Sequence, residues 1–131
     1  MKSLPESLIE IREHSGPDYQ PLIDYQNWRV AIINYTTDLT PDKINRMQKH
    51  TETDEVFVLM TGHCILFVGE GEKTVTKVHA VDMEPYKAYN IKRGVWHSHT
   101  FSEDARVLIV ENRDTVYENS PFVPLSIEQQ K

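Results

Sequence analysis

"KHTETDEVFVLMTG", residues 49–62, sets a histidine and three acids directly ahead of an apolar run. The run that follows Glu55 is rich in β-branched and aromatic residues, which predicts a buried β-strand. Glu55 lies five residues after His50, across the short connection TETD. Because that connection is short, we expect both side chains to reach one point inside a β domain. The stretch therefore predicts a polar pair at the start of a core strand.

Turn signals recur along the chain at a spacing of roughly 8 to 12 residues, which is typical of an antiparallel sandwich or barrel. The glycines of GEGE (69–72) predict one turn, and the dipeptide GH (62–63) predicts a hairpin turn. The two prolines of PFVPL (121–125) favour an edge strand or an arm, because proline cannot donate in a central ladder. The expected strands are 7–13, 22–25, 27–35, 55–60, 64–70, 74–81, 88–93, 95–101 and 105–112, with 44–50 as a further extended segment. This many short strands predicts an all-β jelly-roll barrel.

Length and composition fit one globular domain. The chain has 131 residues, of which 26% are charged and 39% hydrophobic. We expect strands in residues 1–40, the histidine-bearing region in 41–112 and an arm in 113–131. Cys64, the only cysteine, has apolar neighbours that predict a buried position.

Charge and hydropathy exclude two classes of partner. The formal net charge is −6, and the lysines and arginines are scattered, so we expect no nucleic-acid partner. Apolar runs such as VLIV (107–110) are too short to span a bilayer, which predicts no membrane partner. The first residues do not resemble a signal peptide, so we expect a cytoplasmic protein.

Strand alternation places further polar residues beside this pair. Side chains at i and i+2 of a strand point the same way, so Gln48 shares a face with His50. His97 and His99 in WHSH share a face by the same rule. Trp96 should point to the opposite side and pack there.

Imidazole nitrogens with one carboxylate oxygen are the ligands that a borderline or hard divalent metal binds. The candidate metal ligands are Gln48, His50, Glu55, His97 and His99. Such a set can hold zinc, iron, manganese or nickel, and the spacing does not choose among them. The plainer interpretation is a loop histidine beside an exposed acid, together with interior histidines bonded to the backbone. The remaining histidines, at 14, 63 and 79, are expected at the surface or at edges.

Two short motifs resemble the signature of the cupin superfamily. The motifs H-x4-E-x6-G and G-x2-H are filled by His50, Glu55, Gly62, Gly94 and His97. The resemblance spans residues 48–112 and implies a jelly-roll barrel with a metal site inside it. Gln48 stands where that family's first motif has another histidine, and His99 could take the vacant place.

A narrower resemblance is to the ureidoglycolate lyase branch of that family, through HTETDEVF (50–57) and YNIKRGVWHSH (89–99). It implies a metal-dependent enzyme that acts on a small polar acid and splits ureidoglycolate into glyoxylate and urea. The ion would act as a Lewis acid or lower the pKa of bound water. If Glu55 is not a ligand it could serve as the catalytic base, because burial raises the pKa of a carboxyl.

Substrate binding and assembly complete the expectations. Arg46 shares the parity of Gln48 and His50, so its guanidinium could bind a substrate carboxylate. Lys92 is a second candidate, and a solvent position is the alternative for both. A non-catalytic ligand-binding protein, a dioxygenase and a sugar isomerase also stay open on this fold. The resemblance implies a homodimer, to which the C-terminal tail could contribute an exchanged strand.

Overall fold

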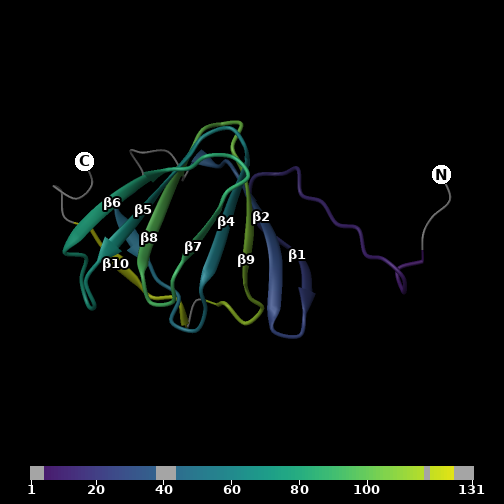
Figure 1. The fold of residues 1–131 in the computed structure, drawn as a ribbon, viewed down its shortest axis with the longest axis horizontal. Helices are drawn as coiled ribbons and strands as arrows, with labels where there is room; N and C mark the ends of the chain where they lie inside the picture. Colours follow the sequence, from purple (N-terminus) through teal and green to yellow (C-terminus); the bar gives the residue numbers. More distant parts are fainter. Residues whose placement is uncertain (1–4, 38–43, 117–118, 126–131) are drawn as a thin grey trace.

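Two five-stranded antiparallel sheets form the described part of the chain, residues 5–37, 44–116 and 119–125 of a computed structural model (Figure 1). The strands are β1 (Asp18–Tyr25), β2 (Trp28–Asn34), β3 (Arg46–Gln48), β4 (Glu55–Thr61), β5 (Cys64–Glu70), β6 (Lys77–Asp82), β7 (Ala88–Ile91), β8 (Trp96–Phe101), β9 (Arg106–Asn112) and β10 (Phe122–Pro124). The first sheet has the order β1-β2-β9-β4-β7 and the second the order β10-β3-β8-β5-β6. No helix in these residues is long and apolar enough to cross a membrane. The predicted all-β class is confirmed.

The main core lies between the two sheets, because each strand turns alternate side chains inward. Phe57 and Leu59 of β4 are buried there, as are Val107 and Ile109 of β9. Leu66 joins them from the second sheet. The same alternation turns a glutamate at the start of β4 and another near the end of β9 toward the interior. Two acids are therefore carried to the border of an apolar core.

The second sheet also buries side chains on its outer face. The cluster there consists of Met47, Val75, Trp96, Val123 and Leu125. Trp96 is 3% exposed and belongs to this outer cluster, whereas His97 lines an interior cavity. The predicted opposite orientation of these two neighbours is confirmed.

The C-terminal strand β10 is an edge strand of the second sheet, as its prolines predicted. It pairs with β3, where Phe122 faces Gln48. Before the strand, the backbone N–H of Thr51 donates to the carbonyl of Asn119 at 2.9 Å. This segment is thus paired within its own chain, and an exchange of the C-terminal tail between two copies stays a prediction.

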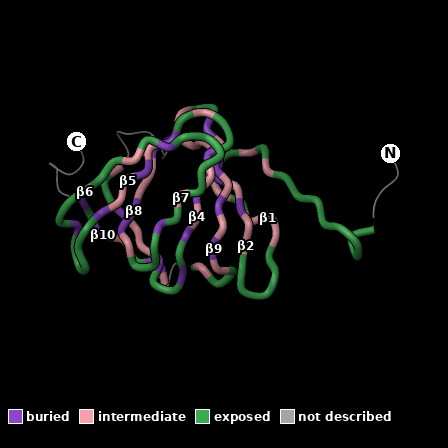
Figure 2. The backbone as a smooth tube through the Cα atoms, in the orientation of Figure 1, coloured by how far each residue is buried: buried purple, intermediate pink, exposed green. Residues whose placement is uncertain are grey.

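The predicted strand at 7–13 is wrong. This segment makes no ladder with a strand, and Figures 1 and 2 show it leading away from the sheets as an exposed arm. The side chains of Leu8 and Ile11 are 79% and 68% exposed. The alternating sequence favoured a strand, but a strand forms only where a neighbour can accept its backbone hydrogen bonds. The prediction at 22–25 falls within the longer strand β1.

The turn at Gly62 and His63 is not the predicted hairpin, because β4 belongs to the first sheet and β5 to the second. Gly62 has a φ of +76°, in the left-handed region that favours glycine. A Cβ at this position would lie 2.6 Å from Cα of Ala105. The chain therefore crosses between the sheets at a point that has no room for a side chain.

Cys64 lies at the start of β5, in the main core, with an exposure of 1%. This confirms its predicted burial. Burial, with a further contribution from the charge of Asp82, raises the pKa of the thiol to about 12. The thiol therefore stays protonated and unreactive in the folded protein.

Candidate metal centre

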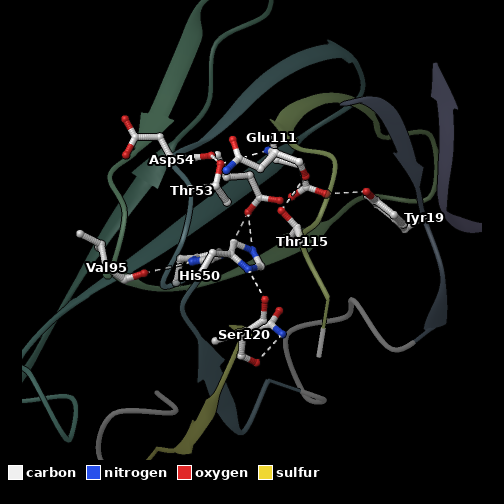
Figure 3. A network of polar contacts seen from close by, with 12 residues as sticks. Tyr19, His50, Thr53, Asp54, Val95, Glu111, Thr115 and Ser120 are labelled. Atoms are coloured by element: carbon white, nitrogen blue, oxygen red, sulfur yellow. Dashed lines mark hydrogen bonds and ion pairs between the residues drawn. The ribbon is translucent and has the colours of Figure 1, made fainter. Parts of the chain in front are cut away.

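Two histidines and one glutamate converge inside the fold, around His50 in Figure 3. Nε2 of His50 lies 3.1 Å from Oε1 of Glu55, and Nε2 of His97 lies 3.0 Å from the same oxygen. The three ligand atoms lie within 4.8 Å of one another. All three residues are buried. The structure thus brings together three of the five residues predicted as metal ligands.

Two strands and the segment that follows a third supply these side chains. His50 follows β3 by two residues, Glu55 opens β4, and His97 is the second residue of β8. Gln48 and His97 are direct neighbours in the pairing of β3 with β8. The cluster therefore spans both sheets, since β4 belongs to the first and the other two strands to the second.

Hydrogen bonds tie the two sequence motifs together next to the cluster. The backbone N–H of Gly94 donates to the carbonyl of His50 at 2.9 Å. The backbone N–H of Arg93 donates to Oδ1 of Asp54 at 2.6 Å. Because Asp54 directly precedes Glu55, these contacts hold the glutamate and the first histidine against the turn that leads into β8.

The second ring nitrogen of each histidine, Nδ1, also has a hydrogen-bond partner. Nδ1 of His97 lies 3.2 Å from the carbonyl of Val95. A carbonyl can only accept, so Nδ1 carries the hydrogen. Nδ1 of His50 lies 2.7 Å from Oγ of Ser120. Metal-binding histidines commonly use their second nitrogen in this way, which orients the other nitrogen toward the ion.

This donor set fits a divalent cation. A neutral imidazole with its hydrogen on Nδ1 has a lone pair on Nε2, and a carboxylate oxygen is an acceptor as well. Such atoms repel one another at the observed separations unless a proton or a metal ion lies among them. Metal–ligand bonds of roughly 2.0 to 2.2 Å leave neighbouring ligand atoms about 3 Å apart when the bonds are near right angles. The two separations from Oε1 of Glu55, 3.1 and 3.0 Å, agree with that value.

The charge state of Glu55 also suits a ligand. Burial acts to raise the pKa of this carboxyl, but the hydrogen bonds with His50 and His97 and the charge of His97 outweigh burial. The pKa of Glu55 is therefore held below its usual range. A carboxylate that stays ionised can bind a cation without first losing a proton.

A second carboxyl lies beside this cluster. The register that pairs Val56 with Val110 sets Glu111 next to Glu55. Glu111 accepts a hydrogen bond of 2.5 Å from the hydroxyl of Tyr19 (Figure 3). Burial, together with the hydrogen bond and charge of Glu55, raises the pKa of Glu111 to about 8. Of the two carboxyls, Glu55 is thus the ionised one and Glu111 holds the proton at neutral pH.

Glu111, Tyr19 and Ser120 were not predicted from the sequence. A signal for Glu111 existed, because it continues the inward i, i+2 series that begins at Val107. Tyr19 and Ser120 carry no comparable pattern. They reach the cluster only through the packing of segments that are distant along the chain.

A cavity of about 390 Å³ opens beside the three side chains. Ile33, Phe57 and Ile109 form its apolar lining, and Tyr19 and Glu111 are among its polar groups. No lysine or arginine lines it among the described residues. Its size is that of a pocket for a small molecule.

Gln48 and His99 line this cavity, but neither belongs to the three-residue cluster. The side-chain nitrogen of Gln48 donates to the carbonyl of Ser120 at 3.0 Å. Nδ1 of His99 is buried and has no hydrogen-bond partner among the described residues. Burial, and then the charge of His97, lower the pKa of His99. As metal ligands, both residues stay predictions.

The two predicted substrate-binding cations do not line the cavity. Arg46 is exposed, and its guanidinium lies 3.9 Å from the ring centroid of Phe122. Lys92 is exposed in a surface hollow that it shares with Asp54. The structure brings neither of them to the cluster. Strand parity predicts the face on which a side chain lies, but not how far along the strand a cavity extends.

Comparisons with known proteins establish the fold. No family model matches this sequence, and no curated protein is similar to it. A 3,4-ketoisomerase from Helicobacter canadensis is similar in structure, with a TM-score of 0.58 and 19% identity over 71% of this chain and 66% of that one. Streptomyces PAC13, solved with uridine, has a TM-score of 0.57 and 8% identity over 89% and 88%. The oxalate decarboxylase of Lactobacillus farciminis has a TM-score of 0.52 and 13% identity over 76% of this chain.

The fold is that of the cupins. The predicted cupin jelly roll is therefore confirmed. The chain spans just under two thirds of the ketoisomerase chain and 27% of the decarboxylase chain. The cluster of His50, Glu55 and His97 lies at the wall of its interior cavity.

Proposed function

We propose that this cupin is a metal-dependent enzyme that acts on a small polar molecule. His50, Glu55 and His97 would hold a divalent ion, and the substrate would occupy the adjoining cavity. The observation that carries the proposal is the convergence of three buried ligand atoms within 4.8 Å at the wall of that cavity. Zinc, iron, manganese and nickel all accept two imidazoles and a carboxylate.

A bound ion would supply Lewis acidity toward a carbonyl or hydroxyl oxygen of the substrate. The chain itself would orient the substrate and exclude water from it. Ile33, Phe57 and Ile109 give the cavity its apolar side. Glu111 offers a second carboxyl outside the three ligands, fixed by the hydroxyl of Tyr19. With Glu55 assigned as a ligand, Glu111 is the carboxyl we assign to proton exchange with the substrate.

The first substrate to test is ureidoglycolate, which the motifs HTETDEVF and YNIKRGVWHSH suggest. Its carboxylate would have to be held by the ion and by neutral donors, because no cationic side chain lines the cavity among the described residues. Arg46 and Lys92 would take part only at the surface, where an anionic substrate first approaches.

A second candidate is a sugar-type substrate, and the lining of the cavity favours it. Hydroxyl groups bind well to acids, amides and phenols, whereas a carboxylate next to the ionised Glu55 is repelled. The QdtA ketoisomerase, at 18% identity and a TM-score of 0.56, was solved with TDP-4-keto-6-deoxyglucose, and PAC13 was solved with uridine. Both are ligands with a sugar ring.

Metal analysis and a turnover assay test the proposal together. We expect purified protein to carry close to one divalent ion per chain, and we expect chelation to remove both the ion and any release of glyoxylate from ureidoglycolate. A metal-loaded protein that leaves ureidoglycolate intact but converts a keto sugar would select the second substrate class. Protein that binds none of the four metals would refute the metal-dependent enzyme and leave the ligand-binding alternative.

We also propose that the exposed N-terminal arm, residues 5–13, joins two copies of the chain. Leu8, Ile9 and Ile11 are 79%, 47% and 68% exposed. A second copy of the chain would cover this apolar surface. Strand β1 lies at the edge of its sheet and can accept an added strand. Deletion of residues 1–13 is expected to turn a dimer into a monomer in light scattering, with metal content unchanged. A full-length chain that stays monomeric at high concentration would contradict this arrangement.

A further inference from the structure

We infer that Ser120 is a positioning residue for the metal centre. Its hydroxyl fixes His50 in the tautomer that turns a lone pair on Nε2 toward Glu55. The inference rests on the proposed metal site, but it concerns a contact outside the three ligands. Ser120 lies 70 residues after His50 in the sequence, and none of the motifs includes it.

The hydroxyl hydrogen of Ser120 is directed by the neighbouring side chain of Asn119. Nδ2 of Asn119 donates to the carbonyl of Asp114 at 3.0 Å, and Oδ1 of Asn119 accepts the backbone N–H of Val116 at 3.0 Å. A backbone carbonyl only accepts and a backbone N–H only donates, so these contacts fix which end of the amide is the oxygen. Oγ of Ser120 lies 3.2 Å from that oxygen. The serine hydroxyl therefore donates to Asn119.

With its hydrogen directed to Asn119, the oxygen of Ser120 is an acceptor toward His50. The distance from Nδ1 of His50 to this oxygen is 2.7 Å. Nδ1 therefore carries the hydrogen, and in the neutral ring the lone pair is on Nε2. Nε2 is the atom that lies 3.1 Å from Glu55. The chain from Asn119 through Ser120 thus selects the tautomer that a metal ligand requires.

Several contacts hold the serine against the site. The side-chain nitrogen of Gln48 donates to the carbonyl of Ser120 at 3.0 Å. The backbone N–H and the hydroxyl of Thr51 both donate to the carbonyl of Asn119, at 2.9 and 3.0 Å. Ser120 is only 2% exposed. Because water is excluded, loss of the hydroxyl would leave Nδ1 of His50 buried without its partner.

Zinc affinity, measured by competition with a chromophoric chelator, tests this role. Ser120→Ala is expected to weaken zinc binding about 10- to 100-fold, the usual effect of removing an outer hydrogen-bond partner of a ligand. Ser120→Thr keeps the hydroxyl and should restore most of the affinity. Thr61→Val removes a hydroxyl hydrogen bond to a backbone carbonyl outside the site, that of Asp104, and should leave the affinity unchanged. Equal affinities for the wild type and Ser120→Ala would overturn the inference, provided that both variants melt as folded proteins.

Nitrogen NMR of metal-free, isotope-labelled Glu55→Ala protein separates this inference from the proposed function, because no carboxylate then faces Nε2 of His50. At a pH where the ring is neutral, His50 is expected to carry its hydrogen on Nδ1 in this variant and to become a mixture of tautomers when Ser120→Ala is added. A hydrogen on Nε2 in the Glu55→Ala variant would overturn the inference whatever the metal data show. The expected tautomer together with a wild type that binds no metal would instead remove the proposed function alone.

Discussion

Replacing His97 with alanine is expected to lower the affinity for a divalent ion roughly a hundredfold or more. Protein zinc sites with four ligands have apparent binding free energies of about 10 to 16 kcal/mol, so each ligand accounts for about 3 kcal/mol. The loss should be of that size, because Nε2 of His97 is one of three ligand atoms that converge among the described residues. Glu55→Gln should have a comparable effect, since it removes the charge and preserves the shape. Isothermal titration with zinc and with manganese measures both changes.

The same strand offers a matched control. His99 lies two residues beyond His97, lines the same cavity and is absent from the three-residue cluster. His99→Ala should therefore leave metal affinity close to that of the wild type. A loss as large as that of His97→Ala would show instead that His99 is a fourth ligand, as predicted for the place vacated at Gln48. Equal binding by all of these variants would exclude the proposed centre.

Replacing Gly62 with alanine is expected to destabilise the fold by about 3 kcal/mol or more. The φ of +76° alone costs an alanine roughly 1 to 2 kcal/mol. The new Cβ would also lie 2.6 Å from Cα and N of Ala105, so the crossing between the sheets would have to open. Backbone atoms cannot turn aside as a flexible side chain can. Chemical denaturation followed by tryptophan fluorescence measures the change in the free energy of unfolding.

Gly94 provides the comparison for that measurement. Its φ of +80° is nearly the same, but a Cβ at this position would meet no atom within 4 Å. Gly94→Ala should therefore cost only the conformational part, about 1 kcal/mol. Equal destabilisation by both alanines would mean that the close approach at Ala105 contributes nothing. Both effects would then come from backbone conformation alone.

Much of the fold could be predicted because strand alternation is a local property. In β4 and β9 the alternation of residue types along the sequence predicts which side chains face inward. The pairing of strands is not local, and this explains the error at Gly62. A glycine followed by a polar residue favours a turn, but the sequence does not show whether the next strand returns to the same sheet. The prediction at 7–13 failed for a related reason. The alternation of apolar and polar residues there suits a strand, but no strand in the described part of the chain lies beside this segment to pair with it.

The candidate site divides in the same way. His50, Glu55 and His97 could be predicted because short motifs and parity set their positions, and the structure brings them together. Arg46 could not be placed, because parity does not report the depth of a cavity. Ser120 could not be found at all. It reaches His50 only because β10 pairs with β3 and draws the preceding residues over the site.

That pairing has a consequence for how the protein is made. Translation delivers His50 70 residues before Ser120, and Glu55 and His97 also precede the serine. A nascent chain would therefore display all three ligands while the tautomer of His50 was still unset. We therefore expect full metal affinity only after β10 has paired with β3 and brought Ser120 to His50.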